Sequence, residues 1–226
     1  MSRQATLDIA APYPQTLDNF VVGDNAEVLA ALKQEPAAEF TGIWLCGPVG
    51  AGKSHLLRGA CLAHSGDAIW VDGTLPDQAR EQLEQALEFG DMVAIDDVAP
   101  LAEDALFASL LLGVYQRMLL TEGVLLVAHR QPATQVACAL PDLGSRMKSL
   151  QHFALVELND TDKGELLRRR AQHLGYGLSD KVLHYWLTHG PRDLGALLTD
   201  LGRLDRASLA AHRQISVPLL KAELGY

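Results

Sequence analysis

Short apolar runs alternate with longer amphipathic stretches along the first two thirds of the chain. Five runs, rich in Val, Ile, Leu or Trp, are short enough to be strands buried on both faces of a sheet. They predict strands over Thr41–Cys46, Ala68–Val71, Met92–Ile95, Val124–Ala128 and Phe153–Glu157. The stretches beside them predict helices over Asn25–Lys33, Lys53–Ala63, Pro76–Phe89, Asp104–Thr121 and a short piece near Thr134–Ala139. This alternation indicates an α/β fold with a parallel five-stranded sheet flanked by helices.

The pattern changes after Leu158, where Asn159-Asp160-Thr161 offers helix N-caps and every later segment has the pattern of a helix. Five leucines between Leu194 and Leu204 recur at i, i+3, i+4, i+7 and i+10, which forms one apolar stripe. The expected helices are Asp162–Leu174, Ser179–Thr188, Pro191–Asp205 and Val217–Leu224, with room for a fifth piece. We therefore expect a tail at residues 1–15, an α/β domain at 16–159 and a small all-helical domain at 160–226.

Composition and charge narrow the class of protein. The 226 residues are 48% hydrophobic and 21% charged, which is the ordinary globular range. A net charge of −9 argues against a protein that grips nucleic acid through a broadly basic surface. The charge is divided unevenly, because residues 1–145 hold 7 basic and 19 acidic residues, whereas residues 146–226 hold 12 basic and 9 acidic.

The sequence patterns of disulfide-bonded, zinc-binding, secreted and membrane-spanning proteins are absent, and this indicates the compartment. Three cysteines without a C-x-x-C pair fit reduced thiols in a cytosolic protein, and the eight histidines lack zinc-site spacing. The N-terminus has no secretory pattern, and the most apolar stretch, Leu106 to Leu120, contains Gln116 and Arg117. It is also shorter than the roughly 18 apolar residues of a membrane span. We expect a cytoplasmic protein with no membrane association.

A phosphate-binding loop follows the first predicted strand. The segment G-P-V-G-A-G-K-S matches the pattern G-x-x-x-x-G-K-[ST], and a helix-compatible run leaves it. Small positions let main-chain N–H groups turn around phosphate oxygens, and the helix N-terminus adds partial positive charge. The lysine would reach the β- and γ-phosphates and the serine hydroxyl would bind Mg²⁺. The expected ADP- or ATP-binding residues are Gly47, Pro48, Val49, Gly50, Ala51, Gly52, Lys53, Ser54 and His55.

Two carboxylates end the third predicted strand. An apolar run delivers Asp96 to the carboxyl edge of the sheet, where Mg²⁺ would lie beside the phosphate loop. Asp97 is then placed to polarise an attacking water as a catalytic group. An Asp pair that caps a strand-to-helix turn is the alternative, and the upstream phosphate loop favours the nucleotide interpretation.

Together these motifs resemble AAA+ ATPases, and within them the DnaA-related family, over nearly the whole chain. The closest similarity is to a shortened, regulatory homologue. The segment Leu17–Asn25 looks like the one that lines the adenine pocket, which implies nucleotide contacts from Phe20 and Val21. The resemblance implies a P-loop AAA+ base domain with a helical lid, a bound ADP or ATP, and Mg²⁺ held by Ser54 and Asp96.

The resemblance implies functional roles for two arginines. Leu140–Arg146 is similar to the segment that presents an arginine finger, so Arg146 would act catalytically in a neighbouring subunit, with a plain surface arginine as the alternative. The segment Gly190–Leu194 resembles the sensor-2 motif of the lid. It places Arg192 in the first turn of a helix, where a cation opposes the helix dipole unless an anion offsets it. A nucleotide phosphate would do so; Asp193 or Asp200 is the alternative.

The chain departs from the family at two points. At the sensor-1 position the alignment places Arg130 where the family carries a small polar or acidic group, and a register shift would place His129 or Gln131 there. We therefore expect weak or no intrinsic ATPase activity. The chain also ends just beyond the last lid helix, where DnaA continues into a helix-turn-helix domain, so we expect no direct sequence-specific DNA binding.

The N-terminal tail carries a second resemblance. Gln4, Leu7 and Ile9 fit the Q-x-x-L-x-[LI] peptide that docks on the DNA polymerase III β sliding clamp. Such a peptide offers one amide and two apolar anchors to a surface pocket. As a bare pattern it is weak, and an ordinary frayed N-terminus is the alternative.

The family resemblance implies a nucleotide-bound regulator of bacterial DNA replication initiation. It would dock on the sliding clamp and stimulate hydrolysis of DnaA-bound ATP, preventing re-initiation; whether it forms a homo-oligomer stays open. The alternative is a DnaC-like helicase loader or another DNA-acting AAA+ ATPase, for which the electrostatic support is the run Arg168–Arg170. A small-molecule kinase fits less well, because the C-terminal helices resemble an AAA+ lid.

Overall fold

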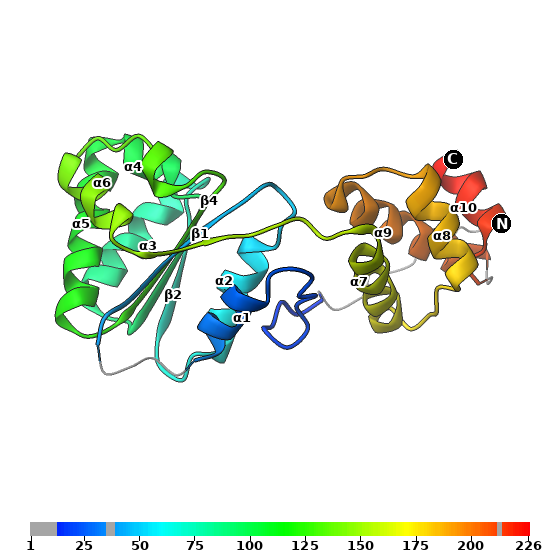
Figure 1. The fold of residues 1–226 in the computed structure, drawn as a ribbon, viewed down its shortest axis with the longest axis horizontal. Coiled ribbons are helices and arrows are strands. Elements are labelled where there is room, and N and C mark those ends of the chain that lie inside the picture. Colours follow the sequence, from blue (N-terminus) through cyan, green and yellow to red (C-terminus); the bar gives the residue numbers. More distant parts are fainter. Residues whose placement is uncertain (1–12, 35–38, 212–213) are drawn as a thin grey trace, which may run out of the picture. The chain divides into compact units, whose positions relative to one another are not determined.

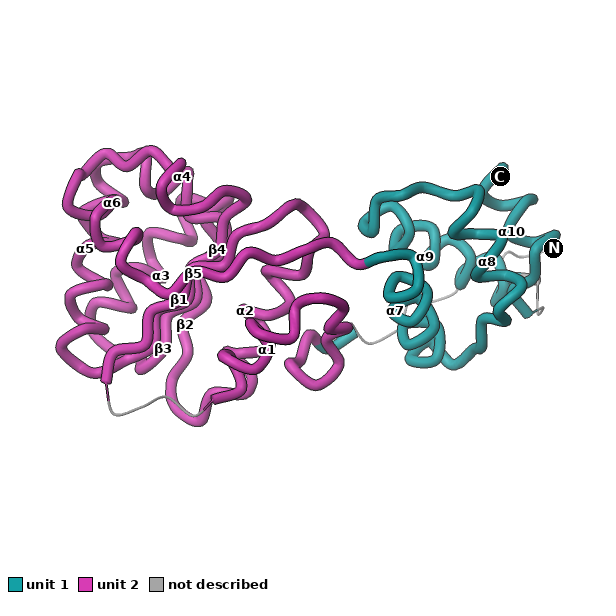
Figure 2. The backbone as a smooth tube through the Cα atoms, viewed as in Figure 1, with its two compact units in different colours: residues 1–14, 159–226 teal, residues 15–158 magenta. Residues whose placement is uncertain are grey.

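The computed structural model describes residues 13–34, 39–211 and 214–226. The chain divides into two compact units, which Figure 2 shows in different colours. Residues 15–158 form one, the base unit, and residues 159–226 together with residues up to 14 form the other, the lid unit. The expected boundary after residue 159 differs from this division by one residue.

The base unit is built around five parallel strands. They are β1 (Thr41–Cys46), β2 (Ala68–Asp72), β3 (Met92–Asp96), β4 (Val124–His129) and β5 (Gln151–Ala154), in the order β2-β3-β4-β1-β5. The predicted parallel five-stranded sheet is confirmed.

The position of β5 differs from the expected Phe153–Glu157. As an edge strand it pairs with β1 alone, from Ile43↔Gln151 to Cys46↔Ala154. Its first two residues, Gln151 and His152, are exposed, so the strand begins before its apolar residues do. A search for buried apolar runs therefore places this strand too late.

Helices cover both faces of the sheet, as Figure 1 shows. The base unit contains α1 (Ala26–Lys33), α2 (Lys53–Ala63), α3 (Pro76–Glu88), α4 (Ala99–Glu103), α5 (Ala105–Leu120), the 3₁₀ helix η1 (Ala133–Gln135) and α6 (Pro141–Lys148). Along β1, Trp44 and Cys46 belong to the core under α3 to α6, whereas Ile43 and Leu45 belong to the core under α1 and α2. This alternation gives the sheet two apolar faces, as parallel sheets require.

The helix α6 corrects the sequence interpretation. The sequence predicts no helix over the Pro-Asp-Leu-Gly-Ser stretch, which forms α6, and predicts one near Thr134–Ala139, where only η1 forms. Pro141 occupies the first turn of α6, where its missing N–H costs nothing, and Leu143 and Met147 are buried on one face. Tertiary burial thus overrides the low helix propensity of Gly and Ser.

The lid unit has its own hydrophobic core. Its helices are α7 (Asp160–His173), α8 (Asp180–His189), α9 (Leu194–Ala211) and α10 (Val217–Leu224). Trp186 of α8 is fully buried among residues of the leucine stripe, including Leu197, Leu201 and Leu204. The helix α9 begins three residues later than expected and runs six residues further.

Two further sequence expectations concern the cysteines, which all lie in the base unit, and the helices of both units. All three cysteines are free thiols in the structure. Among the residues described, no helix combines the length and the apolar character that crossing a bilayer requires.

The lid core gives a direct test of the fold. Leu204→Ala removes a fully buried side chain, and we expect it to lower the free energy of unfolding by about 2–5 kcal/mol in urea denaturation. Leu209→Ala on the same helix is the matched control, because Leu209 is 57% exposed and its loss should change stability by about 0.5 kcal/mol or less. Equal effects of the two substitutions would contradict the assigned face of α9.

Candidate nucleotide-binding site

The phosphate loop, residues 47–54, joins β1 to α2 at the carboxyl edge of the sheet. Gly52 has φ +98°, and a Cβ there would lie 2.7 Å from Cε2 of Phe20. Gly47 has φ +150°, and a Cβ there would lie 2.6 Å from the main-chain oxygen of Leu155. Both positions therefore require glycine. The loop is held between the segment that contains Phe20 and the segment that follows β5.

Lys53 supplies positive charge to this loop. Its Nζ donates to the main-chain oxygens of Gly47, at 2.7 Å, and Pro48, at 2.8 Å. Burial lowers the pKa of Lys53, an effect that the negative charges of Asp96 and Asp97 oppose. Because both acceptors are neutral carbonyls, the ammonium charge is not cancelled by its hydrogen bonds. A cation beside main-chain N–H groups at a helix N-terminus is what a phosphate ligand needs.

Asp96 and Ser54 form the part of the site that fits a divalent cation. Burial raises the pKa of Asp96, and the charge of Asp72 adds to the rise, while a hydrogen bond from the Ser54 side chain opposes it. Carboxylate and hydroxyl oxygens suit Mg²⁺, which binds through few protein oxygens and keeps several waters. The described residues contain no cluster of three or more His, Cys, Asp or Glu that could hold a metal alone. The donor set therefore fits a Mg²⁺ that is shared with phosphate oxygens.

The second carboxylate, Asp97, faces a histidine. Asp97 has φ +54°, unusual for a residue with a side chain, and its Oδ1 lies 2.8 Å from Nδ1 of His129. His129 ends β4, whereas Arg130 and Gln131 follow the strand and are exposed. The main-chain oxygen of Arg130 accepts from the N–H of Gly47 at 3.2 Å. Of the three sensor-1 candidates, His129 is the one whose side chain contacts the carboxylate.

The segment expected to line the adenine pocket packs beneath the loop. Phe20 and Val21 are buried, and the ring of Phe20 meets that of His55 edge-on at 5.4 Å. Nε2 of His55 lies 2.9 Å from the main-chain oxygen of Thr16 and 3.0 Å from Oδ1 of Asn19. The side chains of Phe20 and His55 thus hold the segment against α2. A direct nucleotide contact from these residues stays a prediction.

Sequence reasoning missed a buried link made by Asn25. Its side-chain amide donates to the main-chain oxygen of Val156 at 3.0 Å and accepts from the Val156 N–H at 2.8 Å. Asn25 is 4% exposed. These two hydrogen bonds join the start of α1 to the segment that follows β5. A buried polar residue just before a helix signals such a partner, but the sequence does not show which one.

Arg146 lies apart from the phosphate loop in the same unit. It is exposed in the last turn of α6, and its guanidinium lies 5.6 Å from the ring centroid of Tyr115. Its main-chain oxygen accepts two hydrogen bonds from Ser149, one from the N–H at 3.1 Å and one from the side-chain Oγ at 2.8 Å. Within residues 13–34, 39–211 and 214–226 it forms no ion pair.

Arg192 belongs to the lid unit and precedes α9 rather than lying in its first turn. Its Nη1 pairs with Oδ2 of Asp160 at 2.9 Å, and both side chains are exposed. Its main-chain oxygen accepts from Nζ of Lys163, a residue that is 8% exposed. Asp193 instead caps the helix through the N–H of Ala196. The nearby acidic partner is therefore Asp160, and a phosphate contact from Arg192 stays a prediction.

The arginine run on α7 is occupied by neighbours in the lid unit. Arg168 pairs with Glu165 at 3.2 Å and with Asp180 at 2.7 Å, and Arg169 pairs with Glu165 at 2.8 Å. The guanidinium carbon of Arg170 lies 3.8 Å from the ring centroid of Tyr13. These partners reduce the positive charge that the run could offer to DNA. The clamp-binding residues Gln4, Leu7 and Ile9 lie outside the described residues.

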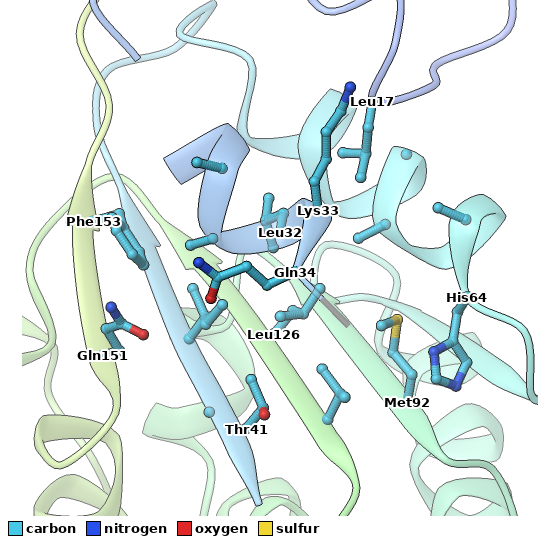
Figure 3. A pocket seen from close by; sticks show the side chains of 18 of the residues that line it. Leu17, Leu32, Lys33, Gln34, Thr41, His64, Met92, Leu126, Gln151 and Phe153 are labelled. Atoms are coloured by element: carbon cyan, nitrogen blue, oxygen red, sulfur yellow. The ribbon is translucent and has the colours of Figure 1, made fainter. Parts of the chain in front are cut away.

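A cleft of the base unit, shown in Figure 3, lies at the other end of the strands from the phosphate loop. This cleft of about 1340 Å³ is lined by the first residues of four strands, Thr41, Met92, Val124 and Gln151. Ligands of open α/β sheets bind outside the carboxyl ends of the strands. We assign no ligand to this cleft.

The family comparison concerns the lid unit. Residues 160–224 match the family model described as "Hda, lid domain". The structure is also similar to domain III of the replication initiation protein DnaA from Thermotoga maritima. That comparison has a TM-score of 0.80 and 17% identity, over 96% of this chain and 97% of that one.

Two further structures share the fold. AMPPCP-bound DnaA from Aquifex aeolicus gives a TM-score of 0.69 and 19% identity, over 86% of this chain and 66% of that one. This chain thus spans just under two thirds of that DnaA. The Holliday junction branch migration motor RuvB from Thermotoga maritima gives 0.71 and 17%, over 94% and 72%. At these identities the likenesses show the AAA+ fold alone.

The buried hydrogen bonds of Asn25 can be tested by a substitution that replaces only the side-chain NH₂ group with an oxygen. Asn25→Asp keeps the acceptor for the Val156 N–H but removes the donor and places a carboxylate near a carbonyl oxygen. We expect the free energy of unfolding to fall by about 1–3 kcal/mol and exchange of the Val156 amide hydrogen to speed up. Glu27→Gln, the reverse exchange of groups at an exposed position of α1, is the control. Wild-type stability of Asn25→Asp would show that the link contributes nothing.

Proposed function

We propose that this chain, whose residues 160–224 match the Hda lid domain and whose fold is that of DnaA and RuvB, is a nucleotide-bound regulator of DNA replication initiation. It docks on the polymerase III β sliding clamp and stimulates hydrolysis of ATP bound to DnaA, which prevents re-initiation. The observation that carries the proposal is the match of residues 160–224 to the Hda lid domain. The AMPPCP bound to the DnaA from Aquifex aeolicus supports nucleotide binding by the shared fold.

The chain's own nucleotide is held by the phosphate loop. The loop N–H groups and Lys53 bind the phosphates, and Ser54 and Asp96 hold Mg²⁺, which neutralises phosphate charge when it is bound. Arg192 adds a further cation when a phosphate replaces Asp160 as its partner. ADP and ATP are both compatible with these contacts, since each carries the phosphates that the loop recognises.

Weak ATP hydrolysis by this chain is consistent with the contact between Asp97 and His129. Oδ1 of Asp97 lies 2.8 Å from a ring nitrogen of His129, so one of the two carboxylate oxygens that could orient a water already has a neighbour. We take His129 as the sensor-1 residue. The chain then acts mainly as a bound regulator rather than as a fast ATPase.

Arg146 performs the chemistry on the partner. A guanidinium is permanently charged and planar, so it can stabilise charge that develops on a transferring phosphoryl group. Its exposure on α6 and its lack of an ion pair among the described residues leave the charge accessible to another molecule. DnaA supplies the ATP, and Arg146 enters from outside as an arginine finger.

Removal of this guanidinium tests the proposal. Arg146→Ala should still bind its own nucleotide, because Arg146 does not touch the phosphate loop, but ATP hydrolysis by DnaA should fall to the rate of DnaA alone. Arginine fingers contribute about 10³ to 10⁵ in rate. The assay follows conversion of DnaA-bound ATP to ADP with the clamp loaded on DNA. Arg80→Ala, an exposed arginine of α3, is the control. Full stimulation by Arg146→Ala would disprove the finger assignment.

The clamp contact has its own test. The double variant Leu7→Ala and Ile9→Ala should bind immobilised clamp about 100-fold more weakly or worse, since each buried apolar anchor contributes about 1.5–3 kcal/mol. Asp8→Ala, between the two anchors, is the matched control, because alternate side chains of an extended peptide point away from the pocket. Binding that is equal for both variants would remove the clamp from the proposal.

A further inference from the structure

Tyr115 contacts the guanidinium of Arg146 directly and the main chain of the same residue through Ser149. Its ring lies 5.6 Å from the guanidinium, within the range of a cation–π contact. Its hydroxyl lies 3.5 Å from Oγ of Ser149, which itself donates to the main-chain oxygen of Arg146 at 2.8 Å. One side chain of α5 thus contacts the head of the arginine and the group that caps its backbone.

The ring of Tyr115 is itself fixed in place. Tyr115 is 5% exposed and belongs to the core between the sheet and α3 to α6. Phe40, just before β1, meets it edge-on with centroids 5.3 Å apart. A buried ring with an aromatic neighbour has little freedom to turn. It therefore offers a fixed surface to a side chain that is otherwise exposed.

We propose that Tyr115 is a positioning residue that holds the Arg146 guanidinium ready for insertion into the partner's nucleotide site. This inference rests on the proposed function of Arg146. A free arginine samples many rotamers, and holding it against a ring removes part of the ordering cost before the partner arrives. The position of Arg146 at the C-terminal end of α6 adds a favourable interaction with the helix dipole. The role belongs to the ring, so phenylalanine should preserve it.

The first experiment compares maximal rates of stimulated ATP hydrolysis in DnaA. Tyr115→Leu should lower the rate at saturating protein about two- to fivefold, which is the value of an exposed cation–π contact, with a smaller change in the half-saturating concentration. Tyr115→Phe should restore most of the loss. In an Arg146→Ala background, Tyr115→Leu should have no further effect, because the group that it positions is gone.

The second experiment does not depend on DnaA, and its first measurement needs no variant. In an NMR spectrum of the unmutated protein, the ring current of Tyr115 should shift the Cδ protons and the Nε–Hε signal of Arg146 away from those of exposed Arg80. The shift should persist in Tyr115→Phe and vanish in Tyr115→Leu. Signals of Arg146 that match those of Arg80 in position and mobility would overturn the inference.

The outcomes separate this inference from the function on which it rests. If Arg146→Ala stimulates fully, the finger assignment fails although the NMR contact persists, and Tyr115 positions nothing catalytic. If Arg146→Ala is inactive and Tyr115→Leu, shown to be folded by its melting curve, stimulates like the unmutated protein, only the role of Tyr115 fails. Loss of activity in Tyr115→Leu that is equally large in Tyr115→Phe would also overturn a role of the ring.

Discussion

The parallel pairing of β1 with β4 is the constraint on which the candidate site depends. It aligns Cys46 with His129, so the phosphate loop begins beside the end of β4. The strand β3 lies on the other side of β4 and ends at Asp96. Because parallel strands present their carboxyl ends at one edge, groups from three separate segments meet there. Any antiparallel or reordered pairing would place the acidic residues away from the loop.

The two adjacent carboxylates at this edge have different environments. Asp96 is half-buried and its burial raises its pKa, an effect that a hydrogen bond from the Ser54 side chain opposes, whereas Asp97 adopts a positive φ and faces His129. Strain of this kind persists only where neighbouring groups enforce it, and it is common at functional sites. The two aspartates thus differ in backbone conformation and in partner although they are adjacent in the sequence.

The arginines of the chain divide by whether a partner neutralises them. Arg168 and Arg169 form ion pairs with acidic neighbours on the lid, and Arg192 pairs with Asp160. Arg146 contacts a ring and leaves its charge exposed. An aromatic face orders a guanidinium without cancelling its charge, which a carboxylate would do. This difference separates Arg146 from the ion-paired arginines of the lid unit.

The sequence by itself determined the α/β order of elements, the phosphate loop, the strand that ends in two aspartates and the all-helical C-terminal part, because these depend on local periodicity and on contiguous motifs. Tertiary structure decided the rest. The helix α6 forms because Leu143 and Met147 are buried, β5 starts at exposed residues because pairing with β1 defines it, and His129 meets Asp97 across neighbouring strands. Such contacts join residues far apart in the chain, and no local pattern encodes which side chains will meet.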